Sequence, residues 1–163
     1  MPTFDSAEEI EEWLNSLIQR TVIPDVAEDT VKCLKEHAQK EVYDAFEPRK
    51  YQRRWSYVND SGYDVNYHGN GVTVSDNVQA NPGEDWGAEQ KSMFTMFEAL
   101  NYRSIVSGDL LPVIESGKGY AFEKEGPVPG PRPFFTHAKE EVEGGRAEQK
   151  VKDSLAKLGF KVS

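Results

Sequence analysis

The sequence has very little cysteine: Cys33 is the only one among 163 residues. A single thiol cannot form a disulfide within the chain, so a reducing compartment suits it. Long apolar runs are missing too, since none approaches the ~18 residues that a membrane-spanning helix needs. The first residues lack the basic and apolar regions of a signal peptide. We therefore expect a soluble protein that is made in a cytoplasm and has no membrane partner.

Basic residues are scarce relative to acidic ones. The chain has 19 Lys and Arg against 28 Asp and Glu, which gives a net charge of -9. Such a surface repels phosphate at long range, so general binding to DNA or to anionic lipid is disfavoured. A local basic patch can still act within roughly 10 Å, about one Debye length at moderate salt.

Motifs that carry chemistry are absent as well. The sequence has no G-x-S-x-G nucleophile motif and no phosphate-binding loop. Cys33 and His37 lie one helical turn apart, but zinc takes three or four ligands and no third is visible. His68 and His137 lie far away in the sequence. We therefore expect no catalytic residue, no metal and no cofactor. A small metal-dependent enzyme that uses Cys33 and His37 is kept as one alternative.

Hydrophobic periodicity predicts helices at both ends of the chain. Ser6 can cap a helix over residues 6–20, and Pro24 can begin a second one over 24–45. A further helical segment covers 134–158, with a break or kink expected at Gly144-Gly145. The stripe of the first helix follows helical spacing and consists of Ile10, Trp13, Leu14, Leu17 and Ile18.

Residues 62–77 alternate between apolar and polar side chains and predict a β-hairpin, with Asn70-Gly71 as its tight turn. Residues 78–133 form a loop-rich middle, within which 108–117 can form one short helix. Together these patterns predict a single α+β domain over residues 1–163. The hairpin has one apolar and one polar face, so it should cover a core on one side only.

The segment "EPRKYQRRWSYVND", residues 47–60, differs from the acidic remainder of the chain. Its cations alternate with aromatic residues, a mixture that suits a protein interface, base stacking on single-stranded nucleic acid, or a plain turn. We favour the interface, because such a patch complements the acidic face of another copy and head-to-tail contacts can close into a ring. A nucleic-acid-binding adaptor that uses 49–57 is the second alternative.

Three elements in this order resemble a known family. They are "VYDAFEPRKYQRR" at 42–54, the hairpin with its tight Asn-Gly turn, and "PRPFFTHAKEEVEG" at 131–144. The pattern is similar to the small neck proteins of long-tailed bacteriophages, the head–tail joining or tail-completion family. The resemblance implies an α+β fold in which helices pack on one face of a small antiparallel sheet that contains the long hairpin. It also implies a structural virion protein without catalytic residues.

The resemblance also implies partners. Copies of the chain would form a ring, typically a hexamer, between the head connector or stopper and the tail terminator or tail tube, with DNA only as passing cargo. The virion neck, assembled in the host cytoplasm, would be its location. By match to the family's motif, Tyr43 and Pro48 would belong to the segment that follows the second predicted helix, together with Tyr51 and Arg53. The residues that we expect at protein interfaces are Arg49, Tyr51, Arg53, Arg54, Trp55, Arg132, Pro133 and Phe134.

Overall fold

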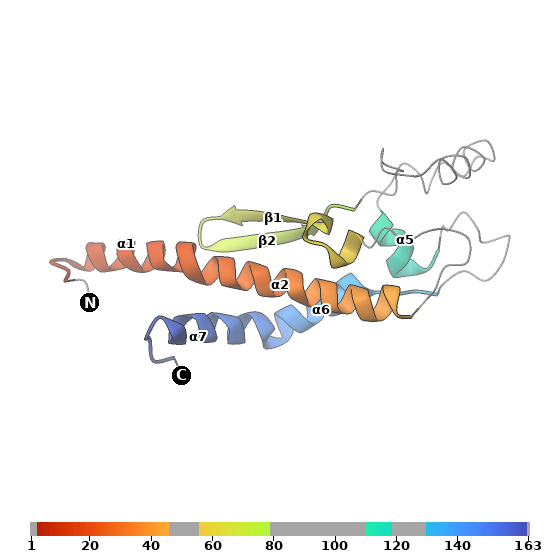
Figure 1. Ribbon diagram of the computed structural model, residues 1–163. Coiled ribbons are helices and arrows are strands. Elements are labelled where there is room, and N and C mark those ends of the chain that lie inside the picture. Colours follow the sequence, from red (N-terminus) through yellow and green to blue (C-terminus); the bar gives the residue numbers. More distant parts are fainter. Residues whose placement is uncertain (1–2, 46–55, 79–109, 119–129, 163) are drawn as a thin grey trace.

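A single long helix forms the axis of the molecule in the computed structural model, which describes residues 3–45, 56–78, 110–118 and 130–162 (Figure 1). The helix consists of α1 (Ala7–Leu17), a π-helical turn (Ile18–Val22), α2 (Ile23–Ala38) and a second π-helical turn (Gln39–Tyr43). Ser6 caps its start as predicted, because the Ser6 hydroxyl accepts a hydrogen bond from the backbone N–H of Glu9 at 3.2 Å.

Pro24 lies at the start of a helix as predicted, but that helix is continuous with the one before it. Pro24 lies in the first turn of α2, directly after the first π-helical turn. In that turn the N–H of Ile23 donates to the carbonyl of Ile18, one residue further back than in an α-helix. The wider turn makes room for the proline ring, which has no N–H to donate. The two helices predicted over 6–20 and 24–45 are therefore one.

The hairpin consists of β1 (Tyr63–His68) and β2 (Gly71–Asp76), which pair antiparallel from Tyr63 opposite Asp76 to His68 opposite Gly71. Two short 3₁₀ turns, Ser56–Val58 and Asp60–Gly62, lead into it. The two turn residues are Gly69 and Asn70, one position earlier than the predicted Asn70-Gly71. Gly69 has a φ of +53°, which glycine adopts without steric cost.

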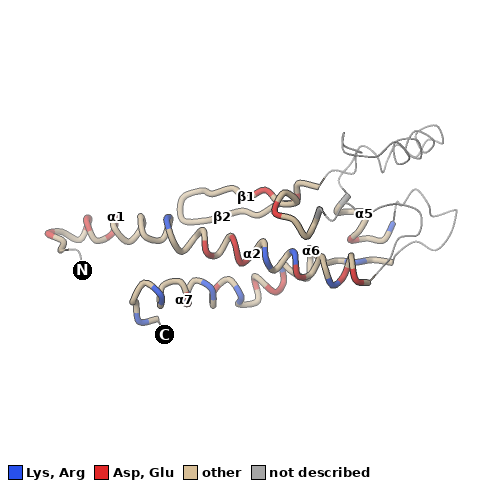
Figure 2. Tube along the Cα trace, viewed as in Figure 1, with Lys and Arg blue, Asp and Glu red and all other residues tan. Residues whose placement is uncertain are grey.

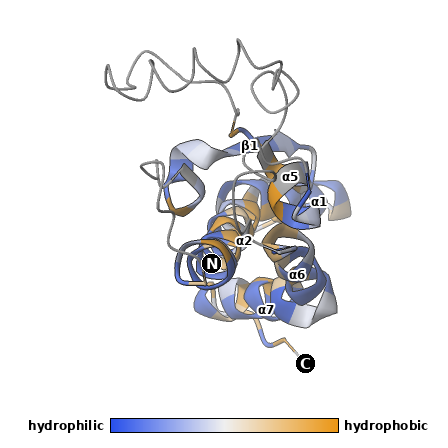
Figure 3. Cartoon of the chain, turned by 90° about the vertical axis from the view of Figure 1, so that its right-hand side faces the viewer, coloured by the Kyte–Doolittle hydropathy of each residue, from blue (hydrophilic) through white to orange (hydrophobic). Residues whose placement is uncertain are grey.

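Two layers cover opposite sides of the long helix. The hairpin packs on one side of α2, while α6 (Phe134–Glu141) and α7 (Ala147–Lys157) run back along the other (Figures 1 and 3). The π-helical turn Val142–Arg146 joins α6 to α7, and its Gly145 has a φ of +129°. The kink predicted at the glycine pair is thus confirmed.

The core lies where α2, the hairpin, α6 and the short helix α5 (Leu110–Ser116) meet. α5 lies within the short helix predicted at 108–117, and Gly117 follows its end with a φ of +66°. The N–H of Arg132 donates to the carbonyl of Ile114 at 3.0 Å. The largest side chains with almost no exposed surface are Tyr57 and Phe134, whose ring centroids are 5.0 Å apart. The predicted α+β fold, with helices packed against a small antiparallel hairpin, is confirmed. In the described part of the chain, no helix combines the length and apolarity that crossing a bilayer demands.

Candidate functional site

A crossed pair of histidines and glutamates lies where α2 faces α6. His37 and Glu41 come from the long helix, and His137 and Glu141 come from α6 with the same spacing of four residues. Because the two helices run in opposite directions, each histidine meets the glutamate of the other helix. His37 Nε2 lies 3.0 Å from Glu141 Oε2, and His137 Nδ1 lies 2.8 Å from Glu41 Oε2. We call these four residues the His–Glu cluster.

Within the long helix, His37 Nδ1 also lies 2.6 Å from Glu41 Oε1. Glu41 therefore presents one oxygen to each histidine, and His37 lies between two carboxylates. Burial opposes the charge on His37, but the bonds to Glu41 and Glu141 outweigh it and raise the pKa of this imidazole. The hydrogen bonds from His37 and Arg146 lower the pKa of Glu141 to about 2. The cluster thus favours the protonated form of His37 and the ionised form of Glu141.

Arg146, at the end of the π-helical turn before α7, extends this network. Its guanidinium holds Asp29 through two bonds, Nε to Oδ2 at 2.8 Å and Nη2 to Oδ1 at 3.3 Å. Nη1 contacts Glu141 at 2.6 Å and Glu36 at 3.2 Å. Figure 2 shows acidic and basic positions along the facing helices. Arg146 therefore ties the C-terminal helices to α2 and fixes the carboxylate that His37 contacts.

Cys33 lies beside the cluster but is fully buried, with its Sγ 3.9 Å from the carbonyl oxygen of Ala138. Burial raises the pKa of this thiol to about 11, so it stays protonated at neutral pH. Donor atoms from two overlapping groups of three lie within 4.8 Å of one another: Cys33, His37 and Glu141, and also His37, Glu41 and His137. Either group has enough ligands to hold a metal ion with water completing the coordination.

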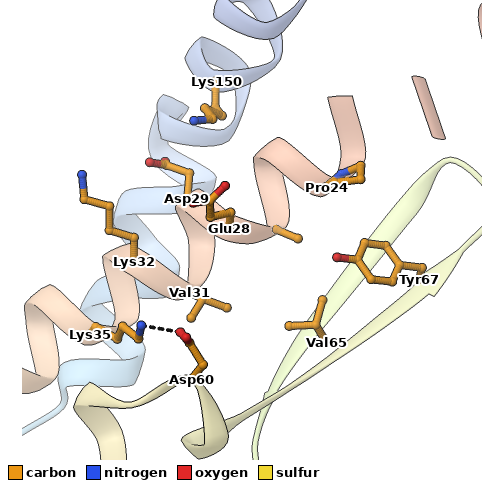
Figure 4. Close-up of a pocket in the computed structure, with 11 residues that line it drawn as sticks. Pro24, Glu28, Asp29, Val31, Lys32, Lys35, Asp60, Val65, Tyr67 and Lys150 are labelled. Atoms are coloured by element: carbon orange, nitrogen blue, oxygen red, sulfur yellow. Dashed lines mark hydrogen bonds and ion pairs between the residues drawn. The ribbon is translucent and has the colours of Figure 1, made fainter. Parts of the chain in front are cut away.

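A groove of about 590 Å³ lies between α2 and the hairpin (Figure 4). An ion pair between Lys35 and Asp60 crosses one part of it. The charges on its lining balance, with three carboxylates against three ammonium groups, and Val31, Val65 and Tyr67 supply apolar surface. This lining lacks histidine, cysteine and serine, and it combines apolar packing surface with charged groups of both signs.

Large exposed apolar side chains gather at one end of the molecule. In the described part of the chain they are Ile10, Tyr67, Leu158 and Val162, which we call the apolar end. α1, the hairpin turn and the C-terminus all lie at this end (Figure 1). Asn70 in the hairpin turn bonds to Asn15 and Gln19 of the long helix, and Phe160 packs on Trp13 with ring centroids 6.2 Å apart.

The predicted interface residues fall into two groups. Arg49, Tyr51, Arg53, Arg54 and Trp55, with Pro48, lie outside the described residues, so their role stays a prediction.

The second group lies at the start of α6. Phe134 is fully buried in the core, and the Arg132 side chain is also buried, with Nη1 3.4 Å from the carbonyl oxygen of Val42. Pro133 between them is partly exposed. Tyr43, from the matched motif, accepts a hydrogen bond from the backbone N–H of Tyr57 at 3.1 Å. These residues make contacts within the chain. Their contact with a partner stays a prediction.

Sequence spacing pointed to Cys33 and His37 and set His137 apart as distant. Glu41, Glu141 and Arg146 were missed, because the cluster uses one histidine and one glutamate from each helix. The signal is present in "HAQKE" at 37–41 and "HAKEE" at 137–141, which both place His four residues before Glu. This spacing puts both side chains on the same face of a helix.

Comparisons with known proteins place the chain in a family. No curated protein and no solved structure shows significant similarity to it. A protein-family model, that of YomN, matches residues 6–157, which is nearly the whole chain and includes the long helix, the hairpin and α6–α7. The chain belongs to the YomN family, a family of Bacillus phage SPBc2-type proteins, and is therefore a phage-derived protein.

Proposed function

We propose that the chain is a structural virion protein of the phage neck, which assembles as a ring that joins the head connector to the tail tube. Membership of a phage protein family supports a phage role. The motifs at 42–54 and 131–144, which resemble head–tail joining and tail-completion proteins, support the neck within that role. The proposed activity is binding, and no bond is made or broken.

The apolar end is the observation that carries this proposal. α1 has no buried residue, although it bears the apolar stripe that the sequence shows, and its Ile10 is 42% exposed. Tyr67 in the hairpin and Val162 near the C-terminus are 59% and 41% exposed. Exposed apolar side chains on three segments at the same end of the molecule offer surface that other protein chains can cover. A subunit of a ring needs such a surface.

Assembly can be tested with the purified chain. We expect an oligomer by native mass spectrometry, and we expect Ile10→Lys with Val162→Lys to lower its mass while the circular dichroism stays that of the folded chain. A matched control, Ala45→Lys with Gln149→Lys, adds the same charge at exposed positions outside the apolar end and should leave assembly intact. A monomer at all concentrations, or equal effects of both pairs, would contradict the proposal.

The basic segment has its own test. Arg53→Glu with Arg54→Glu should leave the subunit folded but reduce the oligomer, because these cations are predicted to contact the acidic face of a neighbour. An unchanged oligomer mass would refute that assignment. If the wild-type chain instead bound single-stranded DNA with a steep salt dependence, the nucleic-acid adaptor would be favoured.

The neck itself is tested in the phage. Purified particles should contain the chain, and a phage that lacks it should accumulate DNA-filled heads and free tails that electron microscopy shows separately. Complementation with the wild-type chain should restore joined particles. Normal joining without the chain, or its absence from particles, would rule out the neck role.

A further inference from the structure

The His–Glu cluster combines two imidazoles and a shared carboxylate from two facing helices, and neither the family nor the proposed neck role assigns it a function. We propose that His37, Glu41 and His137 bind a divalent transition-metal ion of the Zn²⁺ class. The ion would link the long helix to α6.

Three donor groups lie close together, with one histidine at each oxygen of the Glu41 carboxylate. Nδ1 of His37 and Nδ1 of His137 both face the carboxylate of Glu41, at 2.6 and 2.8 Å, and all three donor groups lie within 4.8 Å of one another. Two histidines and a glutamate form a known protein ligand set for zinc. In a tetrahedral site with bonds near 2.0–2.1 Å, ligand atoms lie about 3.3 Å apart. Each histidine nitrogen would therefore move away from Glu41 by less than about 1 Å, while the two histidine nitrogens, which lie within 4.8 Å of each other, would approach by up to about 1.5 Å.

The contact between His37 and Glu41 needs a positive charge. A neutral imidazole carries one N–H, and in the tautomer that donates from Nε2 to Glu141 the Nδ1 atom is an acceptor. Nδ1 would then face a carboxylate oxygen, which is also an acceptor, at 2.6 Å. Such a contact repels unless a proton or a metal ion lies between the two atoms. A bound cation is one of the two ways to satisfy this geometry.

The surroundings match those of metal-binding histidines. A histidine that binds a metal usually donates its other N–H to a carboxylate, which fixes the tautomer and the ring orientation. His37 has this partner in Glu141, and Glu141 is in turn held by Arg146 at 2.6 Å. His37 and Glu41 are each only 19% exposed, whereas His137 is 47% exposed and opens the site to solvent. An ion could enter on that side and keep a water as its fourth ligand.

The donor types also set the expected selectivity. Imidazole nitrogen favours zinc, copper, nickel or iron, whereas Mg²⁺ and Ca²⁺ require shells made of oxygen. We therefore expect binding of Zn²⁺, and of Co²⁺ as its spectroscopic substitute, with little response to Mg²⁺ or Ca²⁺.

The test uses the full chain, first stripped of metal with a chelator. Calorimetric titration with Zn²⁺ should show one site for each chain, and Zn²⁺ should raise the thermal midpoint, because the ion binds the folded state and links two helices. Co²⁺ should give visible absorption bands of a tetrahedral or five-coordinate site. His137→Ala should weaken binding by about 10-fold or more, and Glu141→Gln by roughly 10-fold through the orientation of His37.

Matched variants separate the possible outcomes. His68→Ala removes an exposed histidine on the hairpin and should leave binding unchanged, which excludes general histidine affinity. Cys33→Ser should also leave binding unchanged, since the thiol belongs to the other group of three. His137→Ala should fold normally by circular dichroism because its side chain is half exposed.

Three results would overturn the proposal. One is the absence of Zn²⁺ binding at micromolar concentrations, in which case a proton alone would satisfy His37 and Glu41. Another is equal affinity of the wild type and a folded His137→Ala variant. The third is loss of binding in Cys33→Ser with retention in His137→Ala, which would assign the metal to Cys33, His37 and Glu141. None of these depends on whether the chain forms a neck ring.

Discussion

Replacing Arg146 with methionine should destabilise the chain markedly, because Arg146 is the cation that joins α7 and its preceding turn to α2. Arg146→Met keeps most of the aliphatic stem, so little packing is lost. It removes the bidentate pair with Asp29 and the contact with Glu141. It also leaves both carboxylates, and Glu36, near one another without their shared cation.

The expected magnitude follows from burial. Breaking a fully buried pair costs about 3–5 kcal/mol, because one charge stays buried without its partner. An exposed pair contributes about 0–1 kcal/mol. The side chains of Arg146 and Asp29 are 22% and 20% exposed, between these limits, while Glu36 at 52% adds little. We expect a loss of about 2–3 kcal/mol, which corresponds to a fall of about 5–10 °C in the thermal midpoint for a chain of this size.

The loss of stability in Arg146→Met should become smaller as the pH falls. The hydrogen bonds from Arg146 lower the pKa of Asp29 in the folded chain. A lowered folded pKa contributes stability above the unfolded value of about 4, and this contribution disappears as the pH falls through the folded pKa. The difference in the free energy of unfolding between the wild type and Arg146→Met should therefore be constant near neutral pH and should become smaller below about pH 4.

Urea unfolding followed by circular dichroism, repeated at several pH values, measures this difference. Arg20→Met is the matched control, because Arg20 is exposed on the same long helix, and it should change stability by less than about 0.5 kcal/mol. The reasoning fails if Arg146→Met costs no more than the control, or if its cost is the same at pH 3 as at pH 7.

Other substitutions test the core, a turn and the thiol. Phe134→Ala should cost about 3–5 kcal/mol in urea unfolding, because the ring is fully buried and leaves a cavity; a cost below 1 kcal/mol would contradict its place in the core. Gly117→Ala should destabilise by about 1–3 kcal/mol, because φ is +66° and the new Cβ would lie 2.5 Å from the nitrogen of Pro131. Gly144→Ala, whose Cβ meets nothing within 4 Å, is its control and should be neutral or stabilising. Cys33 should not react with a thiol reagent until the chain unfolds, since it is buried and its pKa is about 11; rapid labelling of the folded chain would disprove this.

Local patterns in the sequence were sufficient to predict most of the fold. The cap at Ser6, the alternation along the hairpin and the kink at Gly145 each depend on a few neighbouring residues, and so does the glycine that follows α7 in the structure. Gly159 has a φ of +90°, and the N–H of Phe160 donates to the carbonyl of Leu155 at 3.1 Å, as a helix ended by glycine requires. Interactions of this short range can be inferred from sequence spacing.

Two local predictions were right only in part, for physical reasons. Pro24 begins α2 as predicted, but a π-helical turn before it joins α2 to α1, and residue spacing alone does not predict such a turn. Both Gly69-Asn70 and Asn70-Gly71 are suitable turn dipeptides, so composition could not choose between them. The pairing of His68 with Gly71 decides in favour of the first.

The His–Glu cluster could not be predicted in the same way, because it depends on the register between two helices that are about one hundred residues apart in the chain. Ala38 and Ala138 lie in the core and have no exposed surface. Small side chains let helices approach closely, which fixes how α2 and α6 are placed along each other. In both helices the histidine directly precedes this alanine, so the packing that buries the alanines also brings each histidine to the glutamate of the other helix. A metal site at this position would therefore depend on the same two alanines, and enlarging Ala138 should weaken Zn²⁺ binding even though no ligand is changed.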